Sequence, residues 1–560
     1  MSGRQPMAAV LALLAAVLPA VALEASAMPQ PPQQAGETAA ASPSPQAPAG
    51  AAGQRPVLAL SLDDAIQRAL VNNELISIQR DEVSAAQSAI TGAEGAYDAV
   101  LAAQFGWRRV NEPVNSAFAG TADGQAALTN ESADTSVELR KLLGTGAEVS
   151  VRTGASHGSS DGAFDLLSPS YGSNLGVAFR QPLLRDRGVD AARLGLTVTA
   201  ADRTRAGASL RAEIIDTVAR VERAYWTLVA LRQAIEVREQ AIELAAEQLE
   251  QTRLRIESGV TPETQISEPV AELERRRGEL LETQEAAARA ENILKLLILG
   301  DADGDLWAAG IDPTEGAVVT LAPVDIAAAL ADALASRVEI DAARAVAERR
   351  HAETLYARDG TKPVLDLVVA YDRFGLAGSP NGTPIPGLPA PAAPGLDGNW
   401  WDSYETLFGG DFDDARIGLV FELPIGNRTA RARAAIATSN ERSARSEVAR
   451  IRKVVRAEVL DAAALLQTAE ARIQAARAAR EAAEVQLSVE QERFAVGLST
   501  NFLVLTRQND LAGARLDEIA ALTDYRKART EMARAAGSLL EERSIDIDTS
   551  THAGEGNDPS

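Results

Sequence analysis

The feature that most constrains the fold is an internal duplication of the sequence. The segment SLDDAIQRALVNNELI, residues 61–76, aligns with DIAAALADALASRVEI, residues 325–340, which lies 264 positions later. In both segments apolar residues recur at spacings of three and four, the pattern of an amphipathic helix. Ser61 followed by Asp64 predicts a helix start that resembles a capping box. The chain is therefore predicted to build one set of elements twice.

Each predicted helix is followed by two segments whose apolar residues alternate with period two, the signal of a β-strand. The first strands are predicted at residues 100–109 and 364–373, again 264 positions apart, and the returning strands at 171–184 and 414–426. Long polar loops are expected between the strands of each repeat. The first loop holds a second alternating pattern at 136–153, and the sequence leaves open whether it forms an extra hairpin or joins the sheet.

After each returning strand comes a very long helical pattern, predicted at residues 190–257 and 427–495. Each would extend about 100 Å at roughly 1.5 Å per residue. Gly259 and Gly497 interrupt the pattern at matched places, and further helices are predicted at 263–299 and 501–540. A tolerated glycine in a continuous helix is the alternative. We interpret both glycines as the tips of helical hairpins, because glycine readily adopts the left-handed conformation that ends a helix.

The two ends of the chain differ from the repeats. Residues 1–27 have the basic start, apolar run and ASA site of a signal peptide, and a membrane anchor is the alternative interpretation. Residues 28–57, rich in Pro, Ala and Gln, are predicted to be disordered, as is the acidic tail 541–560.

Composition excludes several classes of protein. The chain has no cysteine, which excludes disulfides, cysteine-based zinc sites and thiol nucleophiles. Its 55 Lys+Arg against 78 Asp+Glu give a net charge of −23, which argues against nonspecific binding to nucleic acid. Three histidines lie far apart, and no phosphate loop, nucleophile elbow or HExxH motif is present. We therefore expect no catalytic site, no metal and no cofactor.

The strands have one apolar and one polar face, as expected for strands of a membrane β-barrel. Backbone inside a bilayer must be fully hydrogen-bonded, so strands can cross only as a closed barrel. Four strands among long helices cannot close one alone, and several copies of the chain would have to share it. A two-sheet sandwich is the alternative, but it gives the long helices no role. The polar side of the predicted strands is expected to face a water-filled lumen. Its residues include Arg108, Asp366, Asp372, Arg416 and Glu422.

Four motifs together resemble the TolC-type outer-membrane efflux family, also called outer membrane factors. They are SLDDAIQRALVNNELI, the returning strands FRQPLL and FELPIG, and RFAVGLST. The resemblance covers residues 58 to about 540, with a first repeat at 58–320 and a second at 321–540 that contains an extended loop at 375–410. It implies a mainly α fold with a membrane β-barrel. In this fold three protomers each give four strands to a twelve-stranded barrel, and long coiled helical hairpins form an α-barrel.

The same resemblance implies a function and partners. A homotrimer in the outer membrane, with its helical tunnel in the periplasm, would give solutes an exit route. Its partners would be a periplasmic adaptor, also called a membrane fusion protein, and an inner-membrane pump or ABC exporter. Multidrug or small-molecule efflux and type I secretion both remain open, and the sequence does not identify the cargo. The alternative is a periplasmic coiled-coil adaptor or structural protein without a pore.

The resemblance also assigns roles to residues near the tips. The adaptor would dock on the residues around the two glycines, unless these residues only shape the turns. They are Arg255, Ser258, Gly259 and Val260 in the first repeat and Arg493, Val496, Gly497 and Leu498 in the second.

Some family members close the tunnel with aspartate rings beyond the second tip, but this chain has Leu503 and Thr506 at those places. The candidate gate residues are instead Glu263, Gln265, Glu268 and Leu503, with a solvated helix face as the alternative role for the glutamates.

Aromatic residues on the strands could form belts at the two membrane interfaces. The residues concerned are Trp107, Tyr171, Phe179, Tyr371 and Phe421, with Trp400 and Trp401 in the second loop. The two loop tryptophans could instead cap the outer mouth.

Overall fold

The structure is a computed structural model, and it describes residues 56–114, 126–162, 164–259, 262–316, 318–381 and 395–546. These belong to one compact unit, Arg55–Ser560. The expected signal peptide, nearly all of the segment 28–57 and the tail from 547 onward lie outside the described residues. None of the helices in the described ranges is long and apolar enough to cross a membrane.

The duplicated helices start and stop at equivalent positions. Helix α2 (Leu62–Asn72) begins and ends at the positions equivalent to those of α7 (Ile326–Ser336). Helix α3 (Glu74–Glu94) begins at the position equivalent to the start of α8 (Val338–Asp359). Ser61 caps α2, since its Oγ accepts a hydrogen bond from the Asp64 N–H at 3.1 Å. Both helix pairs break at single residues 264 positions apart, Asn73 and Arg337. The duplication predicted from sequence therefore extends to the break points.

The main sheet has six strands in the order β2-β3-β4-β5-β7-β8, all antiparallel to their neighbours. The strands are β2 (Val100–Pro113), β3 (Ala127–Leu142), β4 (Glu148–Ser160), β5 (Leu167–Pro182), β7 (Val364–Pro380) and β8 (Asp413–Glu422). The prediction of four strands per protomer is therefore wrong. Residues 127–160 form a hairpin inside the sheet, and its turn contains Gly146 at φ +82°.

The second predicted loop, 375–410, is also partly regular. Strand β7 continues to Pro380, and helix α9 (Trp400–Gly409) precedes β8. Asn399 caps α9 with a capping box that involves Asp402. Residues 382–394 of the loop lie outside the described part of the chain. The concentration of glycine and proline in this segment predicts a loop. For that reason the sequence does not reveal the end of β7 or the helix α9 on either side of the glycine- and proline-rich part.

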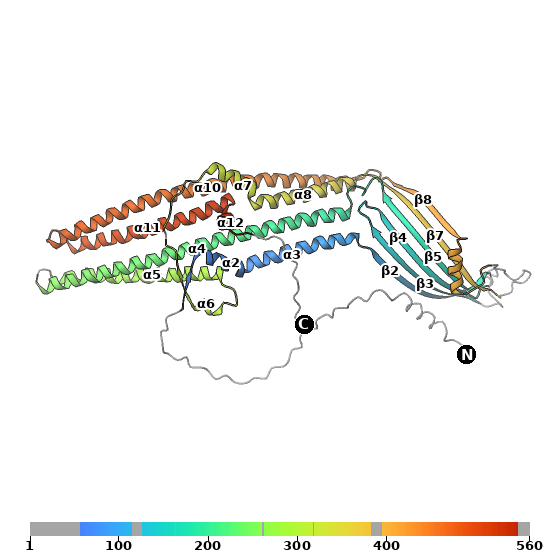
Figure 1. The fold of residues 1–560 in the computed structure, drawn as a ribbon, viewed down its shortest axis with the longest axis horizontal. Coiled ribbons are helices and arrows are strands. Elements are labelled where there is room, and N and C mark those ends of the chain that lie inside the picture. The colour runs from blue at the N-terminus through green and yellow to red at the C-terminus, as the bar shows by residue number, and fades with distance from the viewer. Residues whose placement is uncertain are drawn as a thin grey trace, which may run out of the picture. The chain divides into compact units, whose positions relative to one another are not determined.

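Four long helices form two hairpins. Helix α4 (Ala191–Glu257) returns as α5 (Ser267–Ile298) through the short 3-10 helix η3 (Glu263–Ile266), and α10 (Arg428–Ala495) returns as α11 (Asn501–Ala536). Figure 1 shows the sheet at one end of these helices and the two hairpin tips at the other. Val455, Val459 and Ile473 of α10 are buried in a core shared with α11.

Short elements join the beginning and the end of the first repeat. Strand β1 (Val57–Leu60) pairs in parallel with β6 (Gly310–Pro313), which follows α6 (Gly304–Ala308). The hydroxyl of the buried Tyr225 on α4 donates to the Leu60 carbonyl at 3.1 Å. The small helices η1 (Gly95–Tyr97) and α12 (Leu539–Glu542) complete the described elements, and Arg543 beyond α12 pairs with Glu222 at 2.7 Å. The packed chain therefore continues a few residues past the predicted limit of 540.

Candidate functional site

The second hairpin tip is closed by a Schellman motif. Gly497 has φ +77°, its N–H donates to the Phe494 carbonyl at 3.1 Å, and the Leu498 N–H donates to the Arg493 carbonyl at 2.8 Å. These two bonds satisfy carbonyls that the end of α10 would leave without partners. Thr500 then caps α11 by accepting from the Leu503 N–H. The predicted tip at Gly497 is a tight turn, as the glycine indicated.

The first tip uses a related turn. Gly259 has φ +73°, its N–H donates to the Ile256 carbonyl at 2.9 Å, and the Ser258 Oγ donates to the Arg255 carbonyl at 3.0 Å. Val260, predicted as a docking residue, lies outside the described residues. A Cβ on either tip glycine would meet no atom within 4 Å. The glycines are therefore required by backbone conformation and not by lack of space.

The two tips of one protomer touch each other. The Arg255 guanidinium lies over the Phe494 ring at 4.0 Å from its centroid, and its Nη2 donates to the Phe494 carbonyl at 3.3 Å. Phe494 is buried, although it is only three residues before the tip glycine. Sequence reasoning missed Phe494, because no local pattern shows that an arginine 239 positions earlier will cover its ring.

Apolar side chains remain exposed around the second tip. Val496 and Leu498 keep 71% and 72% of their surface exposed, and Phe502 on the first turn of α11 is also exposed. Exposed apolar clusters on a soluble surface commonly mark sites where another protein binds. The geometry thus provides small apolar groups on a rigid turn, which suits contact with another helix end.

A buried polar network holds the two hairpins together behind the tips. Arg276 of α5 is only 2% exposed, and its Nη2 donates to Asn509 of α11 at 2.9 Å while its Nε donates to Glu272 at 2.8 Å. Partial burial alone would raise the pKa of Glu272, but hydrogen bonds from Arg275 and Arg276 outweigh it and lower the pKa. Because Glu272 stays ionised, Arg276 keeps its charged partner in the buried site.

The candidate gate residues lie just beyond the tips. Glu263 and Gln265 are in η3, and Glu268 is in the first turn of α5; all three are exposed. Leu503 is in the first turn of α11 and is 37% exposed. A constriction would need side chains from several copies of the chain, so the gate stays a prediction.

The five predicted lumen residues share one face of the sheet. The register places Asp366 and Asp372 of β7 on the same side of the sheet as Arg416 and Glu422 of β8. The pairings across the intervening strands place Arg108 of β2 on that side as well. We call this side the polar face. Two buried carboxylates on it are paired, Asp366 with Arg180 at 2.6 Å and Asp372 with Arg152 at 2.8 Å. Exposed Arg416 pairs with Asp414 at 2.7 Å.

The opposite side, which we call the apolar face, carries all five strand aromatics of the predicted belts. One row across the six strands reads Leu101, Leu139, Val151, Val177, Tyr371 and Ala415. Large side chains on this face are exposed in the single chain, including Ile417 at 78% and Leu419 at 66%. Such a surface is much more apolar than a water-facing sheet tolerates.

Helix α9 lies against the apolar face, at the end of the sheet far from the helices (Figure 1). The Ser173 Oγ donates to the Ser403 carbonyl at 2.9 Å, and the Trp400 ring meets Tyr171 edge-on at 6.3 Å. Gly375 makes this approach possible, since a Cβ there would overlap the Ser403 oxygen. Trp401 is 76% exposed. Because α9 is on the apolar face, its tryptophans fit the interface interpretation and not that of a cap over the polar face.

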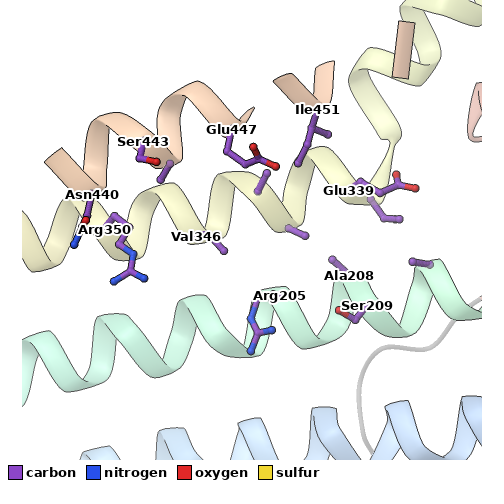
Figure 2. A pocket seen from close by; sticks show the side chains of 15 residues that line it. Arg205, Ala208, Ser209, Glu339, Val346, Arg350, Asn440, Ser443, Glu447 and Ile451 are labelled. Carbon is purple, nitrogen blue, oxygen red and sulfur yellow. The ribbon is translucent and has the colours of Figure 1, made fainter. Parts of the chain in front are cut away.

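A groove of about 730 Å³ lies between α4, α8 and α10 (Figure 2). Its four charged lining residues already have partners: Arg205 pairs with Asp202, Glu339 with Arg337, Arg350 with Glu353, and Glu447 with Arg450. Alanines and Val346 make up much of the remaining wall. The groove therefore provides a packing surface between helices and no unpaired charge that would hold a ligand.

Comparison with known proteins gives a consistent result. The model of the family described as outer membrane efflux protein matches residues 148–299 and 329–538, well over half of the chain. No match was found among the curated proteins.

Several solved structures share the fold. A membrane protein from Pseudomonas aeruginosa is 18% identical with a TM-score of 0.60, and the match covers 88% of this chain and 92% of that one. The CmeC outer membrane channel of Campylobacter jejuni is 14% identical with a TM-score of 0.57, covering 87% and 90%. The outer membrane protein VceC of Vibrio cholerae is 17% identical with a TM-score of 0.57, covering 85% and 96%.

We expect Gly497→Ala to destabilise the second tip by about 1–2 kcal/mol, because alanine is strained in the left-handed conformation. The measurement is amide hydrogen exchange of residues around the tip, together with the melting temperature. Gly513→Ala is the matched control: Gly513 is an exposed glycine inside α11 with open space around it. There alanine should stabilise the helix by about 0.5–1 kcal/mol. Equal effects at both positions would contradict the assigned turn.

Proposed function

Because the chain belongs to the outer membrane efflux protein family, we propose that three copies form one channel through the outer membrane, continuous with a helical tunnel in the periplasm. Proteins of this family are outer membrane channels and not enzymes, and the chain has the same localisation. The channel would give solutes an exit route from an inner-membrane pump. Multidrug efflux and type I secretion are both compatible with this role.

The observation that carries the proposal is the six-stranded sheet with an exposed apolar face and a charged polar face. Among the described residues, the outer edges of β2 and β8 pair with no other strand. A lipid-facing sheet cannot leave these backbone groups unpaired. Pairing between protomers satisfies both edges, covers the apolar face with lipid and encloses the polar face around water. A periplasmic adaptor or structural protein without a pore would have no use for such a sheet.

The partners follow from the tips. The exposed Val496 and Leu498 lie at the far end of the helices from the sheet, as required for contact with a periplasmic adaptor. We propose that the tips, including Val260, bind the end of an adaptor's helical hairpin, and that the adaptor connects the channel to a pump or ABC exporter. The exposed Glu263, Gln265 and Glu268, with Leu503, would set the opening near this end.

The channel itself is tested on adjacent residues of β8. Purified protein is expected to migrate as a heat-dissociable trimer and to conduct ions across a planar bilayer. Leu419→Arg places a charge on the apolar face, which costs on the order of 2 kcal/mol near the bilayer midplane, and it should reduce the amount of trimer in outer membranes. Val420→Arg, on the polar face, should leave the trimer intact. A monomer that conducts no ions would overturn the proposal.

Docking is tested by photo-crosslinking in native cells. A photoreactive residue at Val496 or Leu498 is expected to give adducts with a periplasmic protein that contains a long helical hairpin, because these side chains remain exposed. The control is Ile436, which is also apolar and exposed but lies near the sheet end of α10. If adducts form at Ile436 and not at the tip, the docking assignment is wrong.

The gate is tested by Glu268→Gln in reconstituted channels. Three carboxylates around one axis concentrate cations, so their loss should lower cation selectivity by roughly a factor of two or more. Glu282→Gln is the control, since Glu282 is exposed and lies about four turns further along α5 on nearly the same side. Unchanged conductance and selectivity in Glu268→Gln would exclude a role for this residue in the gate.

A further inference from the structure

The hairpin β3–β4 is inserted between the first and the returning strand of the first repeat. Strand β2 pairs with β3 from Val100↔Arg140 onward, and β4 pairs with β5 from Glu148↔Arg180 onward. In the second repeat β7 pairs directly with β8. The two repeats therefore differ by two strands, and these strands are in the middle of the sheet with partners on both sides.

The hairpin keeps the two-faced pattern of its neighbours. On the apolar face Leu139 and Val151 continue the row that runs from Leu101 to Val177. On the polar face the next row contains Glu138 and Arg152. An extracellular flap would have no reason to alternate in register with the wall beside it.

A charge pair binds the hairpin to the second repeat. Arg152 of β4 reaches over β5 to Asp372 of β7, with 2.8 Å between Nη2 and Oδ1. The residue of β5 between them is Gly176, and a Cβ there would collide with Asp372 and lie 3.3 Å from the Arg152 Nε. The missing side chain leaves the space in which the pair forms.

The turn of the hairpin is anchored at the helical end of the sheet. The Gly144 carbonyl accepts a hydrogen bond from Arg193 Nη2 of α4 at 2.6 Å, and a Cβ on Gly146 would lie 2.8 Å from the Asp186 carbonyl. The strands therefore span the full height between the helices and the far rim. They are built as part of the wall.

From these observations we infer that the hairpin is part of the membrane wall, and that three protomers close a barrel of eighteen strands. This rests on the proposed trimeric channel. Each protomer has six strands, an even number. Strand β2 therefore runs away from the helices, and β8 of the neighbouring protomer, which would lie beside it, runs back toward them. The two edges are antiparallel, as in every other pair of the sheet.

The consequence is a wide outer opening. Barrel diameter grows roughly linearly with strand number, so eighteen strands give about one and a half times the diameter of twelve. A barrel of this size leaves an aqueous channel. Each protomer still connects to its helices at α3, α4, α8 and α10, so the hairpin widens the barrel without adding a helix to the tunnel. Size selection would then occur in the helical part and not in the barrel.

The test uses the absence of cysteine from the chain. Single cysteines replace Ser150 and Val151 on β4, and Ala178 and Val177 on β5, each pair being adjacent residues on opposite faces. In trimers reconstituted in lipid, a water-soluble maleimide should label Ser150→Cys roughly tenfold faster than Val151→Cys, because the reactive thiolate forms in water and not in lipid. Ala178→Cys should exceed Val177→Cys in the same way.

The outcomes separate the two proposals. If β5 shows the alternation and β4 does not, the hairpin lies outside the wall and this inference fails while the channel stands. If neither strand alternates, the membrane barrel itself is wrong. An electron cryomicroscopy image of the unmodified trimer in nanodiscs gives a second measurement: a ring of eighteen strands is expected, and a ring of twelve overturns the inference.

Discussion

The structure depends on the need of every backbone group in the sheet to find a partner. A six-stranded sheet with an apolar side has two outer strands whose N–H and C=O groups are unpaired on one edge. In water such edges invite aggregation, and in lipid they are too costly to exist. The exposed Ile417 and Leu419 near one edge and Trp107 near the other show that a single copy does not satisfy this sheet. Assembly is therefore a condition for the fold and not an addition to it.

The helices solve a different problem with the same duplicated plan. Their cores are narrow and rich in alanine, and they place the buried Arg276, with its partly buried partner Glu272, between the hairpins. A buried guanidinium with all its partners in place fixes how two hairpins align, since a shifted alignment would leave a buried charge unpaired. Apolar packing determines that the helices associate, and the polar contacts determine their alignment.

Much of the fold could be predicted from the sequence because the signals were local. Repeated apolar spacing gave the ends of the long helices to within a few residues, and left-handed glycines marked both tips. The hairpin β3–β4 was less evident. At several positions the hairpin has small or hydroxylated residues on the apolar face, such as Ala133 and Thr135. Its alternation of apolar and polar residues is therefore weak. Strand signals in membrane barrels are weak per segment for this reason.

The site could be predicted only in part. Gly497 and its exposed neighbours follow from a short motif, and the parity of the strands correctly placed the five charged residues on one face. Phe494 and the position of α9 could not be predicted, because both depend on residues far away in sequence. Arg255 must arrive from the other hairpin, and Gly375 must leave room on a strand for a helix that begins 25 residues later.

The contact between Arg255 and Phe494 has a mechanical consequence. It joins the two hairpins at their ends, in addition to the buried hydrogen bond from Gln248 of α4 to Asn501 of α11, so a displacement of one end acts on the other. A cation–π pair of this kind contributes about 0.5–2 kcal/mol, roughly one to three times thermal energy. Because this energy is small, a helix that inserted between the two ends would displace Arg255 from the Phe494 ring at little cost.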